Sequence, residues 1–77
     1  MSNLLILDDD TPTLDLLCKL CRKAGHVVHG FTHGEDAFEH LRNEPVDLLV
    51  ADLHLRRGSG LEIVSRSLQA RPKLPVI

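Results

Sequence analysis

The sequence predicts an α/β protein in which one parallel sheet is covered by helices on both faces. Two apolar runs, at residues 4–7 and 46–51, are continuous rather than alternating, which is typical of strands that are buried on both sides. Segments with helical apolar spacing lie between the strand patterns, as they do in βαβ units. We therefore expect the order β-α-β-α-β-α-β with right-handed crossovers.

The first half of the chain carries signals for two strands and the helix between them. The first strand is expected at residues 3–7, followed by a helix at about residues 11–24. Pro12 suits the first turn of that helix and Gly25 marks its end, because proline lacks an N–H and glycine tolerates a left-handed conformation. Residues 26–31 are then expected to form a short second strand.

A second helix is expected to begin after Thr32 and to run to about Asn43. Thr32 followed by Glu35 matches a capping box, in which each residue satisfies backbone N–H groups at the start of a helix. Pro45 then separates this helix from a strand at residues 46–52.

The last third of the chain predicts a loop, a helix and the start of another strand. The segment 53–60 contains turn glycines, and residues 61–70 show helical spacing of apolar side chains with Leu61 as a core residue. Pro72 ends this helix, and residues 74–77 open a fourth strand.

Composition indicates one soluble globular domain and excludes several classes of protein. The 77 residues are 43% hydrophobic and 26% charged with a net charge of −2, so neither a fibre nor a disordered tail is expected. No apolar stretch approaches the ~20 residues of a membrane span. The N-terminus lacks a basic segment and a cleavage site, which predicts a cytoplasmic protein. The basic residues form no stripe, so direct nucleic-acid binding is not expected.

Cys18 and Cys21 have the C-x-x-C spacing of redox and zinc sites. They lie in the middle of a predicted helix, so neither sulfur gains the helix N-terminal field that lowers a thiol pKa. We expect Cys21 to be a small core residue on one face with Leu17 and Leu20, and Cys18 to lie at the edge of that face. The histidines lie on different predicted elements without the tight spacing of zinc ligands.

Three carboxylates end the two buried strands. Asp8 and Asp9 follow the first aliphatic run, and Asp52 follows the run at residues 46–51. Ligands of open α/β sheets collect at the carboxyl ends of strands, so adjacent strands would bring these three side chains together. Carboxylates this close would repel one another unless a hard divalent ion such as Mg²⁺ kept them ionised. Asp10, in contrast, is expected to cap the following helix.

These residues resemble the receiver domain of two-component response regulators, of the chemotaxis-regulator type. The family pattern is an acidic pair after the first strand and a phosphoacceptor aspartate after the third, followed by the loop D-x-x-[ML]-P-x-x-x-G-L-E. Here the pair is Asp8 and Asp9, and the loop runs from Asp52 to Glu62 with Arg56 in place of proline. The resemblance covers the whole chain, and it implies a flavodoxin-like doubly wound sheet with strand order 2-1-3-4.

The resemblance also implies a role for each matching residue. Asp52 would be the nucleophile that accepts a phosphoryl group from a sensor histidine kinase or a phosphotransfer protein. Asp9 would bind Mg²⁺ directly and Asp8 largely through water, while the backbone carbonyl of His54 would be a further ligand. Such an ion neutralises the equatorial oxygens during in-line phosphoryl transfer.

Compared with the family, residues 1–77 are expected to be a partial receiver domain. Family members continue after the fourth strand with a hydroxyl residue, a helix, a strand that ends in lysine, and a last helix. Without this C-terminal helix-strand-helix portion the fourth strand would be an exposed edge, which predicts self-association into a homo-oligomer.

Two alternatives to a phosphoacceptor receiver remain open at the level of sequence. One is a receiver-like module that works through binding or dimerisation without phosphorylation. The other is a phosphatase of the haloacid dehalogenase type, suggested by Asp8-x-Asp10, but Pro12 stands where that motif has threonine or valine. We therefore do not expect an enzyme.

Overall fold

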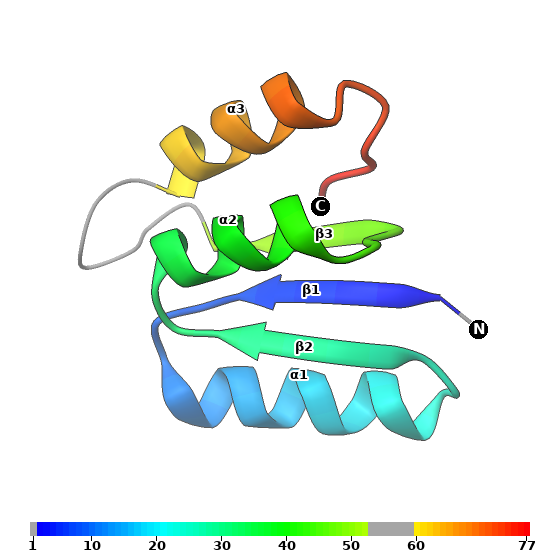
Figure 1. Ribbon diagram of the computed structural model, residues 1–77. Coiled ribbons are helices and arrows are strands. Elements are labelled where there is room, and N and C mark those ends of the chain that lie inside the picture. Colours follow the sequence, from blue (N-terminus) through cyan, green and yellow to red (C-terminus); the bar gives the residue numbers. More distant parts are fainter. Residues whose placement is uncertain (1, 53–59) are drawn as a thin grey trace.

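The computed structural model describes residues 2–52 and 60–77. Within them the chain alternates between strands and helices, as the sequence predicts (Figure 1). The elements are β1 (Asn3–Leu7), α1 (Thr11–Lys23), β2 (Val27–Phe31), α2 (Gly34–Asn43), β3 (Leu48–Ala51) and α3 (Gly60–Ala70).

The strands form a parallel three-stranded sheet in the order β2-β1-β3, with β1 in the centre. Leu5 of β1 pairs with His29 on one side and with Leu49 on the other. Residues 4–7 of β1 are all buried, because this strand has a neighbour on each edge and helices over each face. The first of the two continuous apolar runs therefore corresponds to the central strand, β1.

The predicted fourth strand is present only as a single bridge. Val76 pairs with Leu49, and the Ile77 N–H donates to the Leu49 carbonyl at 2.9 Å. The segment thus lies beside β3, where the order 2-1-3-4 places it. Pro75 accepts a hydrogen bond from the Leu49 N–H at 3.0 Å, but it has no N–H to donate to the ladder, which limits regular pairing.

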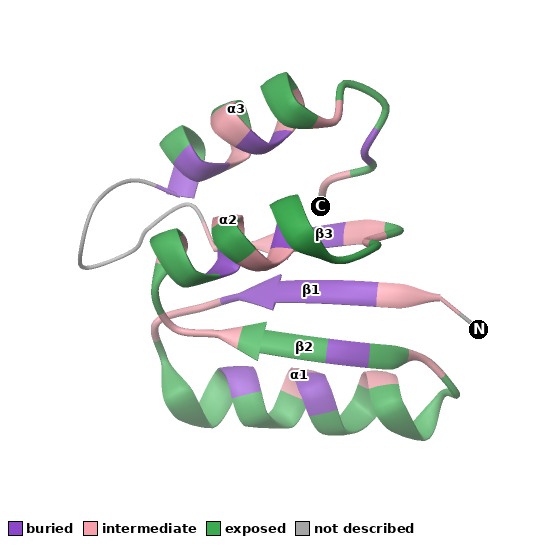
Figure 2. Cartoon of the chain, in the orientation of Figure 1, coloured by how far each residue is buried: buried purple, intermediate pink, exposed green. Residues whose placement is uncertain are grey.

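Helices cover both faces of the sheet, which confirms the predicted doubly wound α/β fold (Figure 1). On one face, α1 packs its buried Leu14 and Cys18 against Leu4, Ile6 and Val28. On the other face, α2 and α3 enclose the larger core cluster. Along β1, Leu5 and Leu7 of this cluster alternate with Leu4 and Ile6 of the first face. Figure 2 shows β1 as the strand that is buried over most of its length. The larger cluster comprises Leu5, Leu7, Ala37, Leu41, Leu49, Ile63 and Leu74.

Helix α1 begins and ends as its sequence predicts. Asp10 is the N-cap, and its carboxylate accepts from the Thr13 N–H at 3.1 Å. At the other end Gly25 adopts a φ of 96°, a conformation that favours glycine. Its N–H donates to the Arg22 carbonyl and the His26 N–H donates to the Cys21 carbonyl, which is the pattern of a Schellman motif.

The face of α1 that enters the core differs from the prediction. Cys18 is buried, whereas Cys21 is only partly buried and Leu20 is 54% exposed. Gly30 of β2 explains why Cys18 faces the sheet, because a Cβ at Gly30 would lie only 2.7 Å from the Cys18 sulfur. The helix therefore packs closest to the sheet where β2 has no side chain, and Cys18 fills that space.

Two further details of the helices correct the sequence interpretation. The N-cap of α2 is His33 rather than Thr32, and it makes no side-chain capping bond, so the predicted capping box is wrong. The Thr32 hydroxyl lies instead 3.0 Å from the His33 ring. Leu61 is 63% exposed rather than part of the core, because α3 turns Ile63 and Ser67 toward the sheet.

Candidate functional site

Asp8, Asp9 and Asp52 lie together at the carboxyl end of the sheet. One carboxylate oxygen from each lies within 4.8 Å of the others, and all three residues are partly buried. The sheet register produces this cluster, since Leu7 pairs with Ala51 and each is followed by an aspartate. The Asp52 N–H also donates to the Leu7 carbonyl at 2.9 Å, which extends the β1–β3 ladder into the site.

Backbone hydrogen bonds and the start of α1 position the acidic pair. The Asp8 N–H donates to the Phe31 carbonyl at 3.1 Å, so β2 also holds this turn in place. The carboxylate of Asp8 accepts from the Asp10 N–H at 2.9 Å, while Asp10 turns its own carboxylate to the start of α1. The third aspartate of the run is therefore a helix cap, as the sequence predicts, and the first two belong to the cluster.

The donor set of this cluster fits a hard divalent cation. Three carboxylates supply only oxygen ligands, and Mg²⁺ and Ca²⁺ prefer oxygen over nitrogen or sulfur. Their mutual repulsion also favours a bound cation. Among residues 2–52 and 60–77, no other group of three histidine, cysteine or acidic side chains is close enough to hold a metal ion. His54, predicted to supply a carbonyl ligand, lies outside the described residues.

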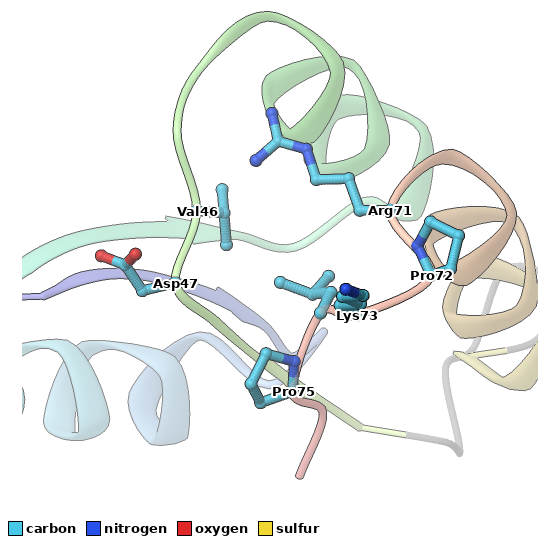
Figure 3. A pocket seen from close by; sticks show the side chains of 7 residues that line it. Val46, Asp47, Arg71, Pro72, Lys73 and Pro75 are labelled. Carbon is cyan, nitrogen blue, oxygen red and sulfur yellow. The ribbon is translucent and has the colours of Figure 1, made fainter.

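A hollow lies at the opposite end of the sheet, near the start of β3. It has a volume of about 530 Å³ and is lined by residues 46, 47 and 71–75 (Figure 3). The Arg71 guanidinium beside it donates to the Glu44 carbonyl at 2.8 Å. None of the three clustered aspartates lines this hollow, so it is separate from the acidic cluster, which is the candidate site.

The buried thiol of α1 is not prepared for redox chemistry. Burial raises the pKa of Cys18 above its ordinary value of 9.0, with Arg22 acting in the opposite direction. A raised pKa keeps the sulfur protonated and therefore weakly nucleophilic. This finding agrees with the expectation that the C-x-x-C spacing serves packing.

Comparison with known proteins assigns the chain to a family. The sequence model of the response regulator receiver domain matches residues 4–77. The chain belongs to the response regulator receiver domain family. The predicted resemblance and the flavodoxin-like fold class are thereby confirmed.

Individual receiver proteins show the same similarity. The response regulator receiver protein CpdR of Brucella abortus is 32% identical over 77 residues, which are 100% of this chain and 64% of CpdR. The CheY-like receiver of Methanospirillum hungatei has a TM-score of 0.95 at 25% identity, covering 99% of this chain and 61% of that one. This chain therefore spans less than two thirds of the length of these relatives.

A second solved structure shows the same fold. It is a response regulator of Burkholderia pseudomallei that contains a phosphorylated aspartic acid, a calcium ion and citrate. Its TM-score is 0.91 at 22% identity, over 99% of this chain and 45% of that one. At this identity the likeness shows the fold alone.

One feature of the receiver could not be found from sequence. The rings of His29 and His40 lie side by side, with centroids 4.4 Å apart, although the two residues are eleven positions apart in the chain and lie on different elements, β2 and α2. No motif joins these positions, so only the packing of α2 on β2 brings them together.

Proposed function

We propose that this receiver domain accepts a phosphoryl group on Asp52 from a sensor histidine kinase or a phosphotransfer protein, and so relays a signal. The observation that carries the proposal is the cluster of Asp8, Asp9 and Asp52, whose ligand atoms lie within 4.8 Å of one another. Its place at the carboxyl ends of adjacent parallel strands is where α/β proteins bind ligands.

Asp52 acts as the nucleophile in this proposal. A carboxylate oxygen of Asp52 attacks the phosphorus of a phosphohistidine in line with the phosphorus–nitrogen bond. That bond breaks, its electron pair leaves with the imidazole of the donor, and an aspartyl phosphate remains. The Asp52 N–H, held at 2.9 Å by the Leu7 carbonyl, keeps the nucleophile at the end of the central ladder.

Asp8 and Asp9 have the role of holding a cation beside the nucleophile. With Asp52 and the backbone carbonyl of His54 they would provide the oxygen ligands of Mg²⁺. The bound ion would neutralise charge on the oxygens of the transferred group. The hydrogen bond from the Asp10 N–H orients Asp8, and the bond from the Asp8 N–H to Phe31 anchors the pair to the sheet.

The proposal extends to partners and setting. The response regulator protein TrrA of Thermotoga maritima has been solved in complex with the histidine kinase ThkA, which supports a kinase as donor. We propose a cytoplasmic signalling role without turnover of a substrate and without direct nucleic-acid contact. In the described part of the chain no helix is long and apolar enough to cross a membrane. We further propose that residues 1–77 are part of a receiver domain, and that copies of the chain associate.

Intact-mass spectrometry after incubation with acetyl phosphate and Mg²⁺ tests this function. We expect a single phosphoryl adduct, because a small acyl phosphate can replace the kinase as donor. The adduct should disappear in Asp52→Asn and when the metal is removed by a chelator. Asp15→Asn, which changes an exposed aspartate of α1, is the matched control and should retain the adduct.

Two results would contradict the proposal. An adduct that persists in Asp52→Asn would show that a residue other than Asp52 accepts the phosphoryl group. A folded chain without any adduct would favour the receiver-like module that acts by binding alone. Circular dichroism of each variant separates either result from loss of the fold.

A further inference from the structure

Strand β2 forms one edge of the sheet, since β1 is its neighbour on one side only (Figure 1). Edge strands carry backbone N–H and C=O groups to which another strand can add. At the start of β2 the Val27 N–H donates to the Ser2 carbonyl at 2.9 Å. At its end the Phe31 carbonyl accepts from the Asp8 N–H at 3.1 Å. These bonds show that the odd-numbered residues of β2 turn their backbone groups toward β1.

The alternate residues of β2, Val28 and Gly30, turn their backbone groups to the open side of the sheet, because a parallel ladder uses every second residue of a strand. Gly30 is exposed and has no side chain to shield these groups. A Cβ at Gly30 would lie 2.7 Å from the Cys18 sulfur, so the close packing of α1 favours glycine at this position. The packing of α1 therefore leaves bare backbone at this edge.

The side chain of Arg22 covers one of these outward groups. Its guanidinium extends from the last turn of α1 and donates to the Val28 carbonyl at 3.0 Å in a partly buried hydrogen bond. Charged side chains at a sheet edge are one means by which proteins prevent another strand from pairing there. The contact joins residues six positions apart, so it forms as soon as α1 and β2 are in place.

A second copy of the same strand is the partner whose geometry fits this edge. If two copies of β2 met antiparallel about a two-fold axis at His29, Val28 of one copy would lie opposite Gly30 of the other. Residues paired in this way exchange both backbone hydrogen bonds, so each copy would need its Val28 carbonyl as an acceptor. Arg22 occupies that acceptor in each copy.

We propose that the outer edge of β2 is a strand-pairing surface for a second copy of this chain, and that the contact of Arg22 with Val28 keeps it closed. This edge lies on the opposite side of the sheet from β3, beside which residues 75–77 run. The proposal is independent of phosphoryl transfer, because neither Arg22 nor Val28 belongs to the acidic cluster.

Sedimentation of Arg22→Met over a range of concentrations tests the proposal. Methionine keeps much of the apolar stem of arginine but has no donor for the Val28 carbonyl. We expect self-association about tenfold tighter or more than in the unaltered chain, because one carbonyl acceptor in each copy becomes available. Lys23→Met, which replaces the neighbouring exposed cation of the same helical turn, is the matched control and should behave as the unaltered chain does. Equal association of all three chains would overturn the proposal.

Amide hydrogen exchange identifies the surface that is used. The Val28 and Gly30 N–H groups should exchange quickly in the unaltered chain and become protected in Arg22→Met as its concentration rises. Association that leaves these two groups unprotected, or that protects only residues 75–77, would equally overturn the proposal. Loss of protection throughout β1 would reveal unfolding of the variant. Arg22→Gln, which also removes the charge but adds less apolar surface, then gives the same comparison.

Discussion

At the scale of single residues, glycines set how closely the helices approach their neighbours. A Cβ at Gly34, the first residue of α2, would lie 2.6 Å from Cγ1 and 2.8 Å from Cδ1 of Ile63 on α3. Real Cβ atoms essentially never show contacts below 3.0 Å. Ile63 is buried and β-branched, so it has little freedom to rotate away.

We predict that Gly34→Ala destabilises the domain. Alanine would gain about 0.4–1 kcal/mol from the lower entropy of the unfolded chain. Overpacking against Ile63 typically costs about 1–3 kcal/mol, which exceeds that gain. The net change in the free energy of unfolding is therefore a loss. Urea unfolding should show a net loss. In an Ile63→Ala background the same change should be neutral or stabilising, and an equal loss in both backgrounds would contradict the clash.

At the scale of elements, the turn from β1 into α1 serves both the fold and the acidic cluster. Asp10 accepts from the Thr13 N–H and satisfies an otherwise unpaired donor at the start of α1. The N–H of the same residue donates to the carboxylate of Asp8. The start of the helix and the orientation of a candidate metal ligand therefore depend on one short segment.

We predict that Asp10→Ala lowers the free energy of unfolding by about 0.5–2 kcal/mol, the usual cost of losing an N-cap. Asp15→Ala is the control, because it removes an exposed aspartate from the middle of the same helix; its effect should stay within about 0.5 kcal/mol. Chemical denaturation of both variants gives the comparison. Equal losses would show that the Asp10 cap contributes nothing specific to α1.

At the scale of the whole molecule, the cluster joins the two strands on which the sheet is built. Asp8 and Asp9 end β1, the central strand, and Asp52 ends its neighbour β3. The repulsion between Asp52 and the acidic pair opposes the folded state, since the unfolded chain keeps Asp52 away from Asp8 and Asp9. A cation that binds only the folded cluster would stabilise the domain by mass action.

We predict that Mg²⁺ at about 100 times its dissociation constant raises the free energy of unfolding by about 2.7 kcal/mol. Asp9→Asn should abolish this gain, and without metal it should be no less stable than the unaltered chain because it relieves repulsion. Thermal unfolding with and without Mg²⁺ measures both effects, with Asp15→Asn as the control. A full gain in Asp9→Asn would contradict the assignment of Asp9 as a ligand.

The sequence by itself determined the class of fold and the residues of the acidic cluster. The first continuous aliphatic run identifies β1 as a strand buried on both faces, whereas β3, predicted in the same way, is fully buried only at Leu49. An aspartate after either run lies at a strand end. The helix boundaries at Asp10 and Gly25 followed from local backbone chemistry, and the structure confirms both. These features depend on neighbours in the chain, so a single sequence is enough to predict them.

Only the tertiary structure decided which sides of the elements meet. Cys18 rather than Cys21 is buried because Gly30, on another element, leaves space for it. The exposure of Leu61 and the contact of His29 with His40 likewise depend on how a helix is rotated against the sheet. That rotation is set by packing between residues far apart in the chain, and helical periodicity alone does not specify it.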